Sequence, residues 1–163
     1  MTKMIPLTQG KFAKVDDEDY EGLNNYKWYA RWNPNTKSFY AVRGDYSLGR
    51  KKGRTIWMHR EIMKTPKGMI CDHKNHDTLF NCRENLRNCT SSQNSMNRES
   101  HRGEASKYKG VHRDNDRWRV VLRKDGVKCI DKHFSTEIEA ARAYDEAARK
   151  YFGEFAVINF NDE

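Results

Sequence analysis

Long apolar stretches are absent from this chain. Hydrophobic residues make up 36% of its 163 residues, and the mean hydropathy is −1.07. No apolar run approaches the roughly 20 residues that span a bilayer, and the N-terminus has no signal-peptide core. A large apolar core is therefore excluded, and a chain of this length forms one domain or two small ones. We expect a soluble cytoplasmic protein with no membrane partner.

Closely paired cysteines are absent as well. The four cysteines are Cys71, Cys82, Cys89 and Cys129, and no two of them form a Cys-x-x-Cys pair. A zinc knuckle is typically built from such pairs. We therefore expect no structural zinc, and we expect reduced thiols that behave as small buried hydrophobic side chains.

Positive charge is distributed unevenly along the chain. The formal net charge is +8. Residues 102–133 hold 10 basic and 5 acidic residues, whereas residues 134–163 hold 3 basic and 7 acidic residues. A basic face backed by an acidic face suits a polyanion bound on one side. A solvated charged surface without a partner would give the same counts, so charge alone leaves both interpretations open.

The most informative stretch begins at Asp72-His73 and continues to Asn85 and Asn94. A carboxylate can bind a hard divalent cation, and a neutral imidazole can take a proton from water near pH 7. Asparagine oxygens can complete a metal shell or orient an imidazole through its second nitrogen. These are the parts of a one-metal site for phosphodiester hydrolysis. An Asp-His pair taken alone is more typical of a solvated turn, and asparagines are common in loops.

The spacing of these residues resembles the HNH nucleases, in the form whose last histidine is replaced by asparagine. The resemblance rests on Asp72-His73, Glu84-Asn85-Leu86 and Ser92-Gln93-Asn94, with Met58-His59-Arg60 upstream. It implies two short strands and a helix around one divalent metal ion, Mg²⁺ or Mn²⁺. It also implies that Asp72 and Asn94 are metal ligands, that His73 is the general base and that Asn85 positions the loop that carries His73.

Other polar residues near this motif have different expected roles. His76 stands where the family often has a small turn residue, and we expect a loop residue or a phosphate contact there. His59 is expected to pack or to hydrogen-bond rather than to catalyse. A basic loop is expected to contact phosphates, which positions a protein on DNA without reading its sequence. Its residues are Arg50, Lys51, Lys52 and Arg54.

The apolar pattern predicts short elements on both sides of a polar boundary. Before the motif we expect two strands in residues 3–14, a helix over 15–23, a hairpin over 28–42 and a helix from His59 to about 64–68. Residues 95–106 are polar and have no apolar periodicity. We therefore place the nuclease module at 1–97, a linker at 98–106 and a second domain at 107–163.

The second domain is predicted to contain three strands followed by one helix. The strands are expected at 108–113, 117–123 and 128–134, and Asp125-Gly126 is typical of a hairpin turn. Ser135 is expected to cap the helix, which should end at Gly153. This order resembles the plant Apetala-two/ethylene-response-factor domain over nearly the whole second domain. The resemblance rests on Lys109-Gly110-Val111-His112-Arg113, the alanine-rich stretch 140–148 and Ile158-Asn159-Phe160.

In the plant family the sheet lies in the major groove of DNA. By position, the resemblance implies DNA contacts from Lys109, Gly110, His112, Arg123, Lys128 and Ile130. Charge and strand position add Arg113, Arg117 and Arg119. The chain lacks the family's Pro-Trp-Gly segment, so the plant target sequence does not carry over. The alternative is a small domain with a solvated basic face.

Together these features predict an α+β protein with an N-terminal ββα-metal HNH nuclease motif and a C-terminal three-stranded antiparallel sheet packed on one helix. They favour a sequence-directed, homing-type endonuclease that uses one divalent metal to nick double-stranded DNA, with no obligate protein partner. It would be encoded by a phage or another mobile element and would act in the cytoplasm of a bacterial host. The main alternative is a non-catalytic, sequence-specific DNA-binding regulator with an inactive HNH fold. An RNA-directed nuclease is less favoured.

Overall fold

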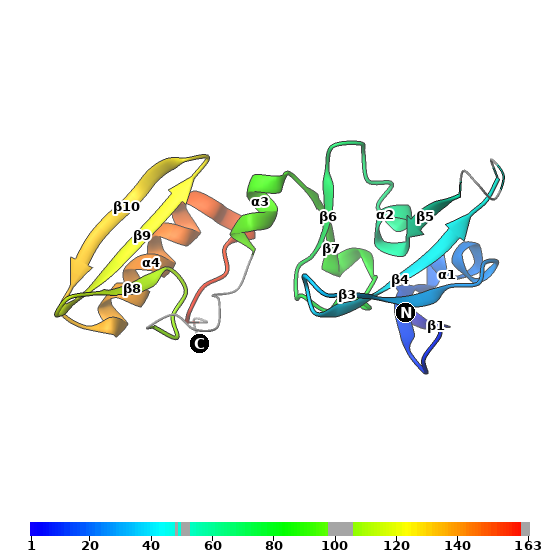
Figure 1. Cartoon of the computed structure of the whole chain (residues 1–163), viewed down its shortest axis with the longest axis horizontal. Helices are drawn as coiled ribbons and strands as arrows, with labels where there is room; N and C mark the ends of the chain where they lie inside the picture. The colour runs from blue at the N-terminus through cyan, green and yellow to red at the C-terminus, as the bar shows by residue number, and fades with distance from the viewer. Residues whose placement is uncertain (48, 50–52, 98–105, 161–163) are drawn as a thin grey trace. The chain divides into compact units, whose positions relative to one another are not determined.

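The computed structural model describes residues 1–47, 49, 53–97 and 106–160 (Figure 1). The chain divides into two compact units, Met1–Cys89 and Thr90–Glu163, and each is described by itself. Both mix helices with small antiparallel sheets. Residues 90–97 belong to the second unit, whereas the sequence analysis placed them in the first, and nearly all of the expected linker lies outside the described residues. In the described part of the chain, no helix is long and apolar enough to cross a membrane.

The first unit contains a β1–β2 hairpin, a sheet in the order β3-β4-β5 and a β6–β7 pair, all antiparallel. The elements are β1 (Thr2–Pro6), β2 (Phe12–Asp16), α1 (Asp17–Asn24), β3 (Tyr29–Asn33), β4 (Ser38–Asp45), β5 (Arg54–Trp57), α2 (Met58–Ile62), β6 (Ile70–His73), the 3-10 turn η2 (Arg83–Asn85) and β7 (Leu86–Cys89). The expected early strands, short helix and hairpin are present. Helix α2 ends before the expected 64–68, because Lys64 adopts a positive φ and Thr65 precedes a proline, a position that disfavours helix.

One apolar core holds these short elements together. Strand alternation turns Ile5, Ala13 and Val15 inward from the β1–β2 hairpin. The β6–β7 pair joins the same core through Cys71 and Leu86. The strand that carries Asp72 and His73 is therefore anchored to the core through its own Cys71 and through Leu86 of the strand paired with it.

The second unit contains the predicted three strands and the helix that follows them, with a short helix before the strands. Its elements are α3 (Ser91–Met96), β8 (Val111–Asp114), β9 (Arg117–Lys124), β10 (Val127–Phe134), α4 (Glu137–Phe152) and the 3-10 turn η3 (Gly153–Phe155). The sheet runs β10-β9-β8, and one of its faces packs on α4. Val120 and Leu122 of β9 pack in one core with Ala140, Ala141 and Ala148 of α4. The opposite face of the sheet carries Arg119, Arg123, Lys128 and Asp131.

The ends of α4 follow from local chemistry. Thr136, not Ser135, is the N-cap, because its hydroxyl accepts from the backbone of Glu139 while the Glu139 side chain accepts from the backbone of Thr136. Gly153 ends the helix at a positive φ, as predicted. Gly110 also has a positive φ, and a Cβ at this position would overlap the ring of Tyr144. Glycine there lets β8 approach α4 closely.

All four cysteines are free thiols. Cys71, Cys82 and Cys89 are buried, and Cys129 is half-buried. Burial raises the pKa of Cys71 and of Cys82 to about 11, which keeps both protonated at neutral pH.

Candidate functional site

Asp72 and His73 are adjacent residues at the C-terminal end of β6. The ladder pairs Asp72 with Arg87 and His73 with Leu86 of β7. Both side chains are largely buried, His73 at 5% exposure and Asp72 at 9%. A polar side chain keeps such a position only when hydrogen bonds replace its water. The hydrogen bonds to these two side chains therefore determine the chemistry that each can perform.

Asn81 fixes the orientation of the His73 imidazole. The Oδ1 atom of Asn81 lies 3.1 Å from His73 Nε2, and Asn81 Nδ2 donates to the carbonyl of Leu79 at 3.2 Å. Because that carbonyl can only accept, the amide oxygen must face the ring, and Nε2 must carry the hydrogen. The lone pair of the neutral ring is then on Nδ1. Asn81 thus selects the tautomer of His73.

The backbone around Asn81 is held by the first hairpin. Residue 80 forms an isolated parallel bridge with Lys14 of β2. The Lys14 amide donates to the Leu79 carbonyl at 2.9 Å, and the Asn81 amide donates to the Lys14 carbonyl at 2.7 Å. With its side chain fully buried, Asn81 is fixed by main-chain and side-chain bonds together.

Two aromatic rings lie close to the His73 imidazole. The ring centroids of His59 and Tyr40 lie 5.0 and 6.1 Å from that of His73, and Trp57 lies 5.9 Å from His59. Burial lowers the pKa of His73, and it lowers the pKa of His59 to about 3. Both rings are therefore neutral at neutral pH, as a base that accepts a proton must be. Within the described residues, His59 Nδ1 has no hydrogen-bond partner.

Asn85 ties together the loop between His73 and β7. Its Oδ1 accepts from the Asn75 amide at 3.0 Å, and its Nδ2 donates to the Phe80 carbonyl at 2.8 Å. Its own carbonyl accepts from the Lys74 amide at 2.8 Å. These bonds are what a loop-positioning residue would make, and that role stays a prediction. In the same loop His76 is exposed and has a φ of 63°.

Arg87 contacts Asp72, a contact that the sequence analysis missed. Arg87 Nε and Nη2 donate to Asp72 Oδ2 at 3.0 and 2.9 Å. Both side chains are about one-tenth exposed. A buried carboxylate needs a counter-charge, and Arg87 supplies one here. The arginine was recognisable as a charged residue in a short strand, but only the strand register makes it face Asp72.

The second predicted metal ligand, Asn94, lies in α3 and hence in the second unit. Its pairing with Asp72 stays a prediction, as does the ββα-metal motif. Among the described residues, no group of three or more His, Cys, Asp and Glu side chains could hold a metal ion. A carboxylate and an amide oxygen nevertheless suit Mg²⁺, which is bound by few protein oxygens and keeps waters and substrate phosphate in its shell.

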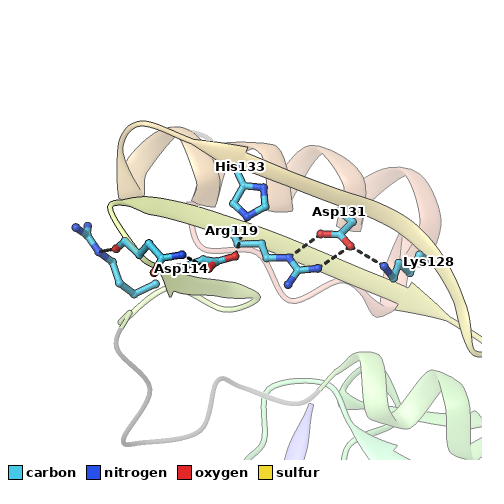
Figure 2. A network of polar contacts seen from close by, with 7 residues as sticks. Asp114, Arg119, Lys128, Asp131 and His133 are labelled. Atoms are coloured by element: carbon cyan, nitrogen blue, oxygen red, sulfur yellow. Dashed lines mark hydrogen bonds and ion pairs between the residues drawn. The ribbon is translucent and has the colours of Figure 1, made fainter.

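The face of the second sheet opposite α4 carries a polar network (Figure 2). Arg119 Nε and Nη2 donate to the two carboxylate oxygens of Asp131, each at 2.8 Å. Lys128 Nζ donates to Asp131 Oδ2 at 2.7 Å. His133 Nε2 and Asp114 Oδ2 lie 2.8 Å apart in the same network. The two acidic residues in this network were not singled out from the sequence.

The remaining predicted DNA-binding residues occupy different surroundings. Arg50, Lys51 and Lys52 lie outside the described residues, and Arg54 pairs with Asp45 at 2.8 Å. His112, Arg117 and Arg123 are exposed. The guanidinium of Arg113 lies 5.0 Å from the Trp118 ring centroid. Lys109 Nζ donates to the Met96 carbonyl at 2.6 Å.

A bulge in β10 separates Lys128 from Ile130. The register shifts between these two residues, so that Lys128 pairs with Arg123 and Ile130 pairs with Leu122. Ile130 therefore turns toward the core, where it packs against buried residues. The resemblance to the plant domain implied DNA contacts from both residues. DNA contact at Ile130 and at the other positions stays a prediction.

Comparison with known proteins finds one relative that matches most of the chain. An uncharacterised HNH endonuclease of Acanthamoeba polyphaga mimivirus is 33% identical over 158 residues, which cover 93% of this chain and 76% of the relative. The chain belongs to the HNH endonuclease family. No protein-family model matches it.

Two proteins of Arabidopsis thaliana match a smaller part of this HNH-family chain. A transcription factor and a transcription repressor, both described as containing AP2/ERF and B3 domains, are 39% and 38% identical over 79 and 80 residues. Each match covers 44% of the chain, and the chain spans about a fifth of each plant protein.

Proposed function

We propose that this HNH-family protein is a DNA endonuclease whose HNH motif hydrolyses a phosphodiester bond and whose β8–β10 sheet directs it to a sequence. The observation that carries the proposal is the fixed His73 imidazole beside Asp72 on one strand. Family membership supports the same chemistry. A buried histidine whose tautomer is set by a buried asparagine is more than core packing requires.

In this mechanism His73 is the general base. Its Nδ1 takes a proton from a water molecule whose oxygen attacks the phosphorus, and the 3′ oxygen leaves. As the ring becomes positively charged, Asn81 Oδ1 continues to accept from Nε2 and stabilises the imidazolium. Asp72 and Asn94 would hold Mg²⁺ or Mn²⁺, which when bound supplies positive charge against the charge that develops on the phosphate. Asn85 keeps the intervening loop in place.

One such motif per chain implies that a single molecule nicks one strand of double-stranded DNA. A double-strand break would need a second active site or a second binding event. We propose a homing-type role, because the same chain contains a nuclease motif and a stretch, 44% of its length, that is similar to parts of two AP2/ERF transcription proteins.

The second unit supports the addressing role through its sheet. A small antiparallel sheet can enter the major groove, where arginine pairs with guanine. Arg117 and Arg123 are exposed on β9, the first before and the second after the buried Val120 and Leu122. Their exposed positive charge supports this role, because a sheet that entered the groove would need cations to meet the DNA.

The Asp72–Arg87 ion pair favours a second candidate, a sequence-specific DNA-binding regulator without cleavage. A guanidinium bonded to the carboxylate occupies the electrostatic role that a metal ion would fill. In this candidate the HNH fold is retained for binding alone. The two candidates differ in one observable, the breaking of DNA.

Sequencing of DNA ends tests the proposal. Pooled genomic fragments are incubated with the full chain and Mg²⁺ or Mn²⁺, and new ends are sequenced. The proposal predicts ends that share a nearby sequence, and Arg117→Ala with Arg123→Ala should scatter them. Arg142→Ala with Arg149→Ala, on α4, is the matched control and should keep the shared sequence. Specific binding without new ends would support the regulator instead.

A further inference from the structure

Arg119 and Asp131 face away from the core of the second unit. On β9 the buried Val120 and Leu122 alternate with Arg119 and Val121, which therefore lie on the opposite face. Asp131 pairs with Val121 in the register, so its side chain lies on that same face. Figure 2 shows the arginine and the carboxylate pointing toward each other, with α4 behind the sheet.

The β10 bulge adds a second cation to Asp131. Residues three apart on a regular strand point to opposite faces, but the register shift after Lys128 places Lys128 and Asp131 on the same face. Asp131 therefore accepts from both Arg119 and Lys128. These hydrogen bonds, that from Arg119 first, hold the pKa of Asp131 well below its ordinary value. The carboxylate is ionised across the neutral range.

The bonds to Asp131 use one edge of the Arg119 guanidinium. A guanidinium has five N–H donors in a planar fork. Asp131 takes the edge formed by Nε and Nη2, so the orientation of the edge formed by Nη1 and Nη2 is also fixed. Two donors side by side on one plane match the O6 and N7 acceptors of guanine in the major groove.

We propose that Asp131 is a specificity-determining residue, which holds Arg119 in the orientation that reads one guanine in the major groove. The inference rests on the proposed addressing role of the second unit. Asp131 acts through Arg119 and through its own charge. An arginine held in place loses less conformational freedom on binding, and a carboxylate on the same face repels phosphates that an unrestrained arginine would otherwise contact.

A purely structural role for the ion pair is the competing explanation. The Arg119 side chain is 38% exposed and that of Asp131 is 22% exposed. Ion pairs this accessible contribute little to stability. A structural role would leave sequence preference unchanged when the carboxylate is removed, whereas a specificity role would change it at one position.

Asp114 offers a matched control on the same sheet. It pairs with His133, and His133 lies opposite Arg119 in the register. Asp114→Asn and Asp131→Asn remove the same charge from the same unit. Only the second replaces one of the two oxygens that accept from the Arg119 fork with an NH2 donor, so that both bonds can no longer form.

Selection from a random duplex library tests the inference. The full-length chain is used in EDTA, so that binding is read without metal-dependent cleavage, and bound duplexes are sequenced for the wild type and each variant. Arg119→Lys should lose the preference for guanine at one position by roughly fivefold to a hundredfold. Asp131→Asn should relax that same position, while its affinity for unrelated duplexes stays equal or rises. Asp114→Asn should keep the guanine preference.

The outcomes separate this inference from the function on which it rests. If Asp131→Asn keeps the wild-type preference at the Arg119 position, or if Arg119→Lys changes no position, the inference is wrong and the addressing role stands. If the wild type enriches no sequence, the addressing role fails and the inference fails with it. Thermal unfolding of each variant shows that a lost preference does not come from a lost fold.

Discussion

His73 has surroundings that a solvated turn would not provide. Asn81 bonds one ring nitrogen, His59 and Tyr40 pack against the ring, and burial lowers its pKa. Each contact restricts the ring to one orientation or one charge state. The catalytic assignment of His73 can therefore be tested through its neighbours as well as by its removal.

Asn81→Leu should slow cleavage without weakening DNA binding. Leucine has a similar volume but cannot accept from Nε2, so the tautomer and the ring orientation are no longer fixed. Loss of a residue that orients a catalytic group typically costs about 10- to 100-fold in rate. Single-turnover cleavage and DNA affinity, measured on the same preparations, provide the comparison. A wild-type rate in the variant would show that Asn81 does not position the base.

His59 should make the folded protein sensitive to acid. Its folded pKa is about 3, below the ordinary value of 6.5, so the unfolded chain binds a proton between these values and the folded chain does not. The free energy of unfolding should fall as pH drops below about 6.5, by up to about 1.4 kcal/mol per pH unit for each such histidine. His59→Phe should reduce that slope in urea unfolding at pH 5 and pH 8. Equal slopes for the two proteins would contradict the assignment.

At the scale of elements, the β6–β7 pair places a guanidinium against a predicted metal ligand. Arg87→Met should destabilise the first unit by about 3–5 kcal/mol, because it removes the two bonds to the buried Asp72 carboxylate. If Asp72 also binds a divalent cation, Mg²⁺ should raise the melting temperature of this variant more than that of the wild type. Differential scanning fluorimetry at increasing Mg²⁺ measures both effects.

Arg83→Met is the control for that experiment. Arg83 makes exposed ion pairs with Glu18 and Asp19, so its loss should change stability by less than about 1 kcal/mol and leave the Mg²⁺ response unchanged. Equal Mg²⁺ responses in Arg87→Met, Arg83→Met and the wild type would argue against a metal at Asp72.

The sequence predicted elements better than it predicted contacts. The three strands and helix of the second unit follow from alternation, the Asp125-Gly126 turn and helical periodicity. The position of the α4 cap was also readable, because Glu139 stands three residues after Thr136 and completes a capping box, whereas Ile138 follows Ser135 at that distance. Helices, strands and caps can be predicted from the periodicity of apolar residues because they depend on residues that are close together in the chain.

Contacts between strands could not be predicted in this way. Arg87 meets Asp72, and Asp131 meets Arg119, only through strand register. The β10 bulge shifts that register by one residue and turns Ile130 inward. The choice of Asn81 as the partner of His73 depends on a loop held by Lys14, which is far away in the sequence. These contacts depend on tertiary structure and cannot be predicted from the spacing of residues along the chain.

In the molecule as a whole, we assign the chemistry to the HNH motif and sequence recognition to the β8–β10 sheet. The first unit contains a buried histidine oriented by hydrogen bonds, and the second presents a polar sheet face backed by an apolar core. The net charge of +8 suits a protein that approaches a polyanion. Binding should therefore weaken with salt, whereas the chemistry at His73 should depend on its local contacts.

The role of His73 in cleavage is measured by the nicking of a supercoiled plasmid that carries a sequence recovered in the end-sequencing experiment. Wild type and His73→Ala are compared with Mg²⁺, with Mn²⁺ and with EDTA, and binding to the same DNA is measured in parallel. The account predicts open-circle product only from the wild type with a metal ion, and equal binding by both proteins. Product from His73→Ala at the wild-type rate would contradict the assignment of the base.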